Sequence, residues 1–232
     1  MFPTDYTSIL KRIEAIEPVA YCKSRNFLDG AVTRLSPYIS RGVISTKQVY
    51  EHVMTLGYKP YQIEKMLQEL AWRDYWQQIW INKGIEIDQD LRSEQKGAIH
   101  QSISISLLHR RTGVTAIDEG IETLYDTGYM HNHLRMYTAA ITCNIGKNHW
   151  RYPAQWMYYH LLDGDWASNA LRWQWVAGTN SNKQYIANQE NINKYCKTDD
   201  KDTFLDIGYD ELANIAVPKE LEEITDVELK TN

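Results

Sequence analysis

The chain has 232 residues, of which 43% are hydrophobic and 12% aromatic, and this is enough apolar material for one sizeable core. Its three cysteines lie far apart in the sequence, which argues against a disulfide framework or a zinc knuckle and favours a reducing, cytoplasmic compartment. The sequence shows neither a signal-peptide pattern nor a stretch that approaches a membrane span, so we expect neither feature.

The net charge of −5 is unevenly distributed. Residues 198–232 hold 11 Asp/Glu against 3 Lys, a net charge of −8, whereas residues 1–197 carry a net charge of +3. The body of the protein can therefore present a basic face to nucleic acid although the whole chain is acidic. Eight Trp and 16 Tyr fit either a bulky core or a site that stacks flat rings.

The hydrophobic spacing predicts helices throughout and no strand, so the expected fold class is all-α, as one domain. In the helix predicted for residues 61–80, Trp72, Trp76 and Trp80 share one stripe, which usually marks a core-facing side. Residues 84–113 are polar and turn-rich, and we expect an irregular excursion there. The predicted helices cover residues 5–17, a start at Ser36-Pro37, 45–57, 61–80, 115–125, 132–143 and 153–162.

The most unusual stretch is DGDWASNALRWQWVAG, residues 163–178. It combines the carboxylates of Asp163 and Asp165 with the carboxamide of Asn169 and the indoles of Trp173 and Trp175. Such a set suits a polar, ring-shaped ligand. The alternative is a surface turn followed by a helix whose tryptophans fill the core.

Common catalytic motifs do not occur in this sequence. His131, His133 and Cys143 lack the spacing of a helical metal-ligand pair, so no metal site is expected. GxSxG, a P-loop and GxGxxG are also missing, which argues against the common hydrolase, NTPase and Rossmann folds. The phosphates of a nucleotide cofactor would instead meet TRLSPY, where the Thr33 and Ser36 hydroxyls stand at a helix start.

Five segments together resemble the FAD-binding domain of photolyases and cryptochromes. Each is weak alone, but all five occur in the order and rough spacing of that family. The resemblance covers residues 21–197, so residues 1–20 are expected to form an N-terminal helical extension and residues 198–232 an acidic C-terminal tail. The segments are RLSPYISRGVIS (34–45), QELAWRDYW (68–76), TGYMHNHLRM (127–136), HW (149–150) and DGDWASNALRWQW (163–175).

The resemblance implies FAD as the cofactor, folded into a U so that adenine and flavin lie near each other at the bottom of a cavity. Asp163 and Asp165 would face the flavin ring and ribityl chain, and Arg135 would pair with the first of them. Asn169 would lie beside flavin N5, where a carboxamide can stabilise a reduced, anionic flavin. The expected cofactor-binding residues are Tyr21, Thr33, Arg34, Leu35, Ser36, Arg73, Arg135, Asp163, Asp165 and Asn169.

The resemblance also implies a deoxyribodipyrimidine photo-lyase. In that reaction light excites the reduced flavin, and an electron passes to a pyrimidine dimer flipped out of DNA, which then splits. Trp72 and Trp175 match the aromatic walls that hold the flipped dimer, where stacking is worth about 1–3 kcal/mol per base. Glu69 matches the acid that hydrogen-bonds the dimer. Asn132 and Met136 match further contacts, and because (6-4) photolyases have histidines there, a cyclobutane dimer is favoured.

Trp173 and Trp150 match an electron relay toward the flavin, so the expected catalytic set is Glu69, Asn132, Trp150 and Trp173. Residues 81–149 contain no Trp to supply an exposed third member, and a tyrosine is the alternative end of the relay. No antenna domain precedes the first motif, so no second light-harvesting chromophore is expected on this chain. Where the family usually has Thr-Ser before Arg34, this chain has Val32-Thr33.

His133 and the segment Ala-Leu-Arg172 also depart from the family pattern, so contacts to DNA phosphate are expected to differ.

Two further hypotheses stay open. One is a cryptochrome-like photoreceptor or flavin redox protein whose acidic tail docks a protein partner, and the other is a flavin-free structural descendant. The tail is expected to be solvated and partly ordered, with a short helix in FLDIGYDELANI as the alternative. The candidates for a basic DNA face are Arg34, Arg41, Arg110, Arg111, Lys147, Arg151, Arg172 and Lys183.

Overall fold

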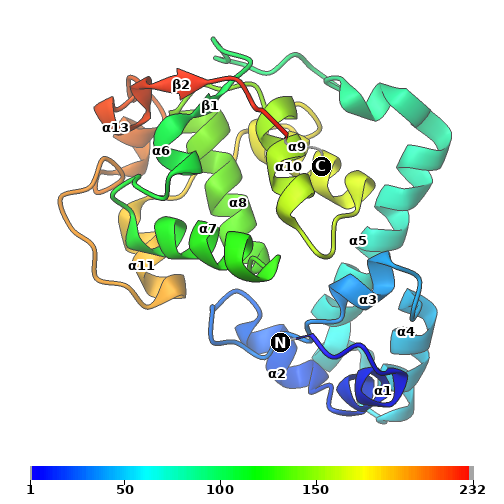
Figure 1. Cartoon of the computed structure of the whole chain (residues 1–232). Helices are drawn as coiled ribbons and strands as arrows, with labels where there is room; N and C mark the ends of the chain where they lie inside the picture. Colours follow the sequence, from blue (N-terminus) through cyan, green and yellow to red (C-terminus); the bar gives the residue numbers. More distant parts are fainter. Residues whose placement is uncertain (1, 230–232) are drawn as a thin grey trace.

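The computed structural model describes residues 2–229 and confirms the all-α fold class (Figure 1). Short β1 and β2 form one antiparallel pair in which Ile103 lies opposite Thr225. In chain order the elements are α1 (Tyr6–Glu14), α2 (Pro18–Ser24), α3 (Ser36–Ser40), α4 (Thr46–Thr55), α5 (Pro60–Lys83), the 3-10 helix η1 (Gly84–Asp88), β1 (Ile103–Ser104), α6 (Ile105–Leu108), α7 (Thr115–Thr127), α8 (Asn132–Ala140), the π-helix η2 (Ile141–Ile145), α9 (Arg151–His160), α10 (Trp166–Ala177), α11 (Gln189–Cys196), α12 (Tyr209–Leu212), α13 (Lys219–Glu222) and β2 (Ile224–Thr225).

The helices predicted from spacing all form, and several of them begin at ordinary capping signals. The Asp5 carboxylate accepts from the Ser8 N–H at the start of α1. At the start of α4, Ser45 and Gln48 form a reciprocal capping box. The predicted start at Ser36-Pro37 becomes α3, with proline in the first turn, where its missing N–H costs nothing.

Spacing did not predict α2 and α11, which are only seven and eight residues long. The stretch 163–178 forms a turn and then α10, as its alternative interpretation expected, but Asp163 is buried rather than on a surface turn and Trp175 is exposed rather than in the core. An added Cβ at Gly164 would lie 3.1 Å from the carbonyl oxygens of Leu161 and Tyr158. This close turn places Asp163 and Asp165 just before α10.

The two larger of the three hydrophobic cores within residues 2–229 lie at opposite ends of the molecule. The first packs α1, α3, α4 and the first half of α5 around Ile9, Val53 and Ile63. The second is larger and packs α7 to α11 around Ile117, Tyr137 and other buried side chains. Figure 1 shows the blue helices of the first core at one end, the green to red elements at the other, and α5 along one edge. The helix α5 contacts both α2 and α10, and so connects the two cores.

The prediction that Trp72, Trp76 and Trp80 form a core stripe is wrong for two of them. Trp76 is 9% exposed, but Trp72 is 47% and Trp80 is 39% exposed. Trp76 packs with Ile87 of η1 and Leu171 of α10. Those elements cover only one side of the second half of α5, which leaves the other two rings outside.

The described part of the acidic tail is folded onto the body, so the expectation of a solvated extension is wrong for residues 198–229. Leu205, Leu212 and Leu221 are fully buried in the second core. The Asp200 carboxylate accepts from both the N–H and the hydroxyl of Thr115, and thereby caps α7 from outside that helix. The alternative prediction of a short helix in FLDIGYDELANI is confirmed by α12. None of the described helices has the length and apolar character needed to cross a bilayer.

Candidate functional site

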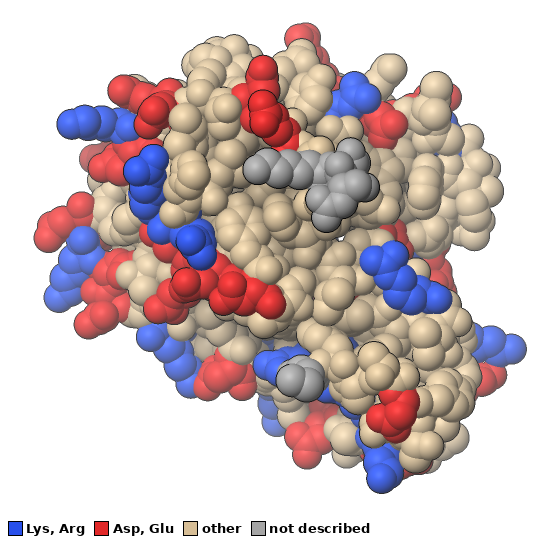
Figure 2. Space-filling view, viewed as in Figure 1, with Lys and Arg blue, Asp and Glu red and all other residues tan. Residues whose placement is uncertain are grey.

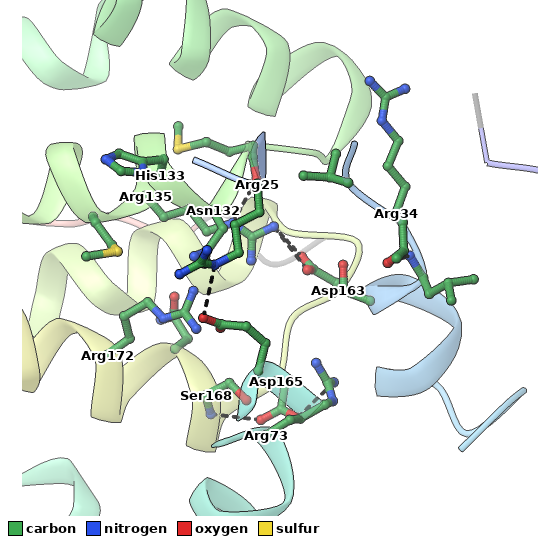
Figure 3. A pocket seen from close by; sticks show the side chains of 18 of the residues that line it. Arg25, Arg34, Arg73, Asn132, His133, Arg135, Asp163, Asp165, Ser168 and Arg172 are labelled. Carbon is green, nitrogen blue, oxygen red and sulfur yellow. Dashed lines mark hydrogen bonds and ion pairs between the residues drawn. The ribbon is translucent and has the colours of Figure 1, made fainter. Parts of the chain in front are cut away.

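A cavity of about 560 Å³ lies where the two cores meet, within the range of roughly 300–1,000 Å³ typical of small-molecule and cofactor sites. Its wall is formed by side chains of α2, α3, α4, α5, α8, α10 and α11 and the adjoining turns (Figure 3). The structure brings to this wall all ten expected cofactor residues together with Glu69, Asn132, Met136 and Trp173. Their individual roles remain predictions.

The helix α10 presents one continuous stripe to the cavity. Asp165, Ser168, Asn169, Arg172 and Trp173 all line it. Their spacing of three, four, seven and eight residues from Asp165 is the period of one helix face. The Asn169 amide group donates to the Ala154 carbonyl at 2.8 Å, which fixes the orientation of its side chain.

Asp163 and Arg135 form a buried ion pair beside this stripe. Nη2 of Arg135 lies 2.9 and 3.0 Å from the two carboxylate oxygens of Asp163, and Nε of Arg135 donates to the Met130 carbonyl. Burial by itself would raise the pKa of Asp163. The Arg135 cation and the Ser36 hydroxyl outweigh burial, so the pKa of this carboxyl lies below its ordinary value of 3.8. Asp163 is therefore an anion held in a fixed position at neutral pH.

Asp165 connects α10 to α5. Its Oδ1 accepts from the Ser168 N–H at 2.9 Å, which is the N-cap bond of α10. Its Oδ2 accepts from Arg73 at 3.0 Å and from Gln77 at 2.7 Å. The two predicted carboxylates thus have separate arginine partners, and their positions along the cavity wall are fixed.

Hydroxyl groups and Arg34 gather at the start of α3. The Thr33 hydroxyl accepts from the Leu35 N–H, and Thr33 and Ser36 both line the cavity. Arg34 has a φ of 52°, a left-handed conformation that is uncommon for a residue with a side chain. Its guanidinium lies 5.6 Å from the centre of the Tyr129 ring. This segment offers donors for the phosphates of a nucleotide cofactor.

Another part of the wall is lined by the predicted lesion contacts. Glu69 of α5 and Asn132 and Met136 of α8 all line the cavity. Glu69 lies 3.7 Å from Nε of Arg25, whose Nη1 donates to the Cys22 carbonyl. A carboxylate acceptor and an arginine donor therefore lie side by side here.

Trp72 and Trp175 do not line the cavity. Trp72 stacks on Trp76 with ring centres 5.0 Å apart, and Trp175 packs against Tyr185 at 5.8 Å. Both Trp76 and Tyr185 are lining residues. Each predicted wall is thus one ring removed from the cavity and exposed to solvent, and its role as a wall stays a prediction.

The two predicted relay residues are buried in different surroundings. Trp173 lines the cavity, and its indole N–H has no partner among the described residues. Trp150 is fully buried, and its indole N–H donates to Asp90 at 2.7 Å. Asp90 comes from the irregular segment that precedes β1.

His131 and His133, at the start of α8, are buried. The N–H of His133 donates to Nδ1 of His131, which is the N-cap bond of this helix. Burial, reinforced by nearby positive charge, lowers the pKa of each imidazole to about 4, so both are neutral at pH 7. Within residues 2–229 no three His, Cys, Asp or Glu side chains are placed to share a metal ion.

The predicted basic DNA face is only partly on the surface. Arg34 and Arg172 line the cavity; Arg172 is only partly exposed, which corrects the expectation of a surface position for it, whereas Arg34 is exposed as expected. The others do not line it, and in the face shown in Figure 2 acidic and basic side chains are interspersed at the edge formed by the C-terminal elements. Sequence reasoning also missed Arg25 and the cavity positions of His133 and Arg172. The helical period counted from Asp165 was the available signal for Arg172.

Comparisons with known proteins agree with the helical fold. A family model described as the FAD binding domain of DNA photolyase matches residues 66–230. Deoxyribodipyrimidine photo-lyase of Alkalihalophilus pseudofirmus is 34% identical over 149 residues, which are 62% of this chain and 31% of that protein. Cryptochrome DASH of Danio rerio is 30% identical over 173 residues, which are 68% of this chain and 32% of that protein. The chain therefore spans about a third of the length of these relatives.

Solved structures share the fold at low sequence identity. A cryptochrome of Synechocystis superposes with a TM-score of 0.75 at 23% identity, over 84% of this chain and 44% of that one. An archaeal photolyase of Sulfolobus tokodaii with two FAD molecules superposes with a TM-score of 0.69 at 23% identity, over 84% of this chain and 45% of that one. These likenesses support the helical fold itself.

Proposed function

This chain belongs to the family of the FAD-binding domain of DNA photolyase, and from this premise we propose that it repairs cyclobutane pyrimidine dimers in DNA in a light-dependent reaction. FAD is the cofactor of this family. One observation carries the proposal: a single cavity joins the expected flavin contacts Asp163 and Asn169 to the expected lesion contacts Glu69, Asn132 and Met136. A protein that only sensed light would not need the second set.

The cavity fits FAD in size and in chemistry. The Arg34 segment supplies a cation and the Thr33 hydroxyl for the diphosphate. The fixed Asp163 and Asp165 carboxylates can accept hydrogen bonds from ribityl hydroxyls or from the ring N–H. The indole N–H of Trp173 and Nε2 of His133 are buried without partners among the described residues, as expected for groups in a site that a ligand completes.

When FAD is bound in its reduced form, it supplies a light-driven electron to the dimer. The residues of the chain bind the cofactor and the dimer and orient them toward each other. The Asp163–Arg135 pair holds one edge of the site, and the Asn169 carboxamide, fixed by its bond to Ala154, presents its free oxygen. Glu69 accepts a hydrogen bond from the base. The enclosing walls keep water from the electron-rich centre.

Dark binding and illumination together test this proposal. Purified protein is reconstituted with FAD, reduced, and mixed with oligonucleotides that do or do not contain one cyclobutane thymine dimer. We expect tighter binding to the dimer-containing strand and loss of the dimer under blue light, measured by chromatography of the strand. Equal affinity for both strands together with intact dimers after illumination would refute the repair function.

A cryptochrome-like photoreceptor is the second candidate, because cryptochromes are among the relatives, including Cryptochrome DASH at 30% identity. This function predicts light-dependent changes in hydrogen exchange of residues 198–229 and no preference for damaged DNA.

We propose the cytoplasm as the compartment, since Cys22, Cys143 and Cys196 are all free thiols.

A further inference from the structure

Arg172 is a cation in the cavity with no carboxylate of residues 2–229 at ion-pair distance. Five arginines and three carboxylates line the cavity. Three of the arginines have carboxylate partners: Arg135 has Asp163, Arg73 has Asp165, and Arg25 has Glu69. Arg34 lies in the segment assigned to phosphate binding. Arg172 remains, and it makes no hydrogen bond or ion pair with any residue of the range 2–229.

The position of Arg172 is set by α10, because it lies seven residues after Asp165 and three after Asn169 on the stripe that faces the cavity. Figure 3 shows Arg172 on the opposite side of Asp163 from Arg34. Burial lowers the pKa of Arg172, and the nearby Glu69 carboxylate opposes that shift. The side chain is therefore a charged donor, partly removed from water, beside the predicted lesion contact Glu69.

A guanidinium that is partly removed from water and has no acceptor is costly, so this position favours a ligand that brings acceptors. Arg172 and Arg25 supply donors, and Glu69 supplies an acceptor. The pairing edge of thymine or uracil presents two carbonyl acceptors and one N–H donor, which is the complementary set. Cytosine has an amino donor in place of one carbonyl and an acceptor in place of the N–H, which mismatches both Arg172 and Glu69.

We propose that Arg172 donates hydrogen bonds to a carbonyl oxygen of the flipped pyrimidine dimer and, with Glu69, makes the site selective for thymine and uracil over cytosine. This inference rests on the proposed repair function and adds a specificity residue to it. No covalent step is involved, and the effect is on binding of the lesion.

The test is binding in the dark to three strands that contain a uracil dimer, a cytosine dimer or no dimer. Uracil and cytosine differ only at this edge, and freshly prepared cytosine strands limit deamination. Fluorescence anisotropy is measured for the FAD-loaded wild type, Arg172→Met and Arg172→Lys. The exposed Arg92→Met serves as a control that removes one positive charge elsewhere. Bound FAD and the circular dichroism spectrum are recorded for each protein.

We expect Arg172→Met to weaken binding of the uracil dimer by about 10- to 100-fold, as for the loss of a charged hydrogen bond, and to change binding of the cytosine dimer about threefold or less. Arg172→Lys should recover part of the loss, and Arg92→Met should weaken all strands alike. If Arg172→Met weakened binding of both dimers equally, or lost FAD while its selectivity stayed unchanged, the inference about Arg172 would be overturned and the proposed repair function would stand. A wild type that does not distinguish damaged from undamaged strands would instead refute the repair function.

Discussion

Trp173 and Trp175 stand two residues apart on α10 but have different surroundings. Trp173 is 2% exposed and lines the cavity, whereas Trp175 is 40% exposed and packs on Tyr185. We predict that Trp173→Phe slows photoreduction of bound FAD and leaves lesion affinity unchanged, because it removes the oxidisable indole and keeps an aromatic ring. Absorption spectroscopy during illumination measures the first property, and dark binding measures the second.

Trp175→Phe should weaken binding of the lesion. If this ring stacks on the flipped base, the smaller ring should cost a fraction of the roughly 1–3 kcal/mol that such a stack supplies. Photoreduction should proceed at the wild-type rate. Should both substitutions alter the same property, the division of roles between these two tryptophans is wrong.

The buried histidines make stability depend on pH. The pKa of His131 and that of His133 are each lowered to about 4 from the ordinary 6.5, so the unfolded chain takes up protons first as the pH falls. Stability is therefore complete above pH 6.5 and is lost progressively toward pH 4. Urea unfolding between pH 7.5 and 4.5 should show this decline, and His133→Gln should flatten it. An exposed histidine, His109→Gln, should leave the slope as in the wild type.

Individual residues show where sequence reasoning succeeds and where it does not. Asp163, Asp165 and Asn169 could be placed in one site because they match a family motif and follow a helical period. Arg172 follows the same period, but a lone arginine lies more often on the protein surface than in a cavity wall. The sequence also gave no sign that this arginine lacks a carboxylate partner. The exposure of Trp72 was equally hidden, because the stripe pattern does not say which of its members a neighbouring element covers.

At the scale of elements, the irregular segment between η1 and β1 is held by a carboxylate rather than by a core of its own. Asp90 accepts from the Trp150 indole at 2.7 Å, from His149 at 3.2 Å and from the N–H of Gln95 at 2.8 Å. The sequence predicted an irregular excursion over residues 84–113, which holds for the segment between η1 and β1 but not for η1, β1 and α6 themselves. It could not predict the anchor, because the partners of Asp90 lie up to 60 residues away.

Asp90→Ala should therefore destabilise the protein. The substitution leaves the indole N–H of Trp150 buried without an acceptor, which costs about 1–3 kcal/mol. The free energy of unfolding in urea measures the loss, and amide exchange of residues 89–101 should become faster at the same time. Asp126→Ala, at an exposed site on α7, is the matched control and should stay within about 0.5 kcal/mol of the wild type. A loss no larger than that of the control would show that Asp90 is no anchor.

At the scale of the whole molecule, two cores enclose one cavity and α5 spans both. The N-terminal helix α1 shares the first core with α4 through Ile9 and Val49, and the tail shares the second. We therefore propose that residues 2–229 form one cooperative unit, in place of a domain with a separate extension and tail. Composition suggested a solvated and partly ordered tail, since its net charge is −8. The few leucines that anchor it are too sparse to give a periodic pattern.

If the tail is part of this unit, removing one of its anchors should destabilise the whole protein. Leu212→Ala empties a fully buried position in the second core, and such truncations cost about 2–5 kcal/mol. Leu229→Ala is the same substitution at a residue that is 39% exposed, so a far smaller change is expected. Urea unfolding followed by tryptophan fluorescence should show one transition shifted to lower urea in Leu212→Ala. If the tail were instead an arm reserved for a partner, both variants would unfold like the wild type, and only partner binding would reveal the difference between them.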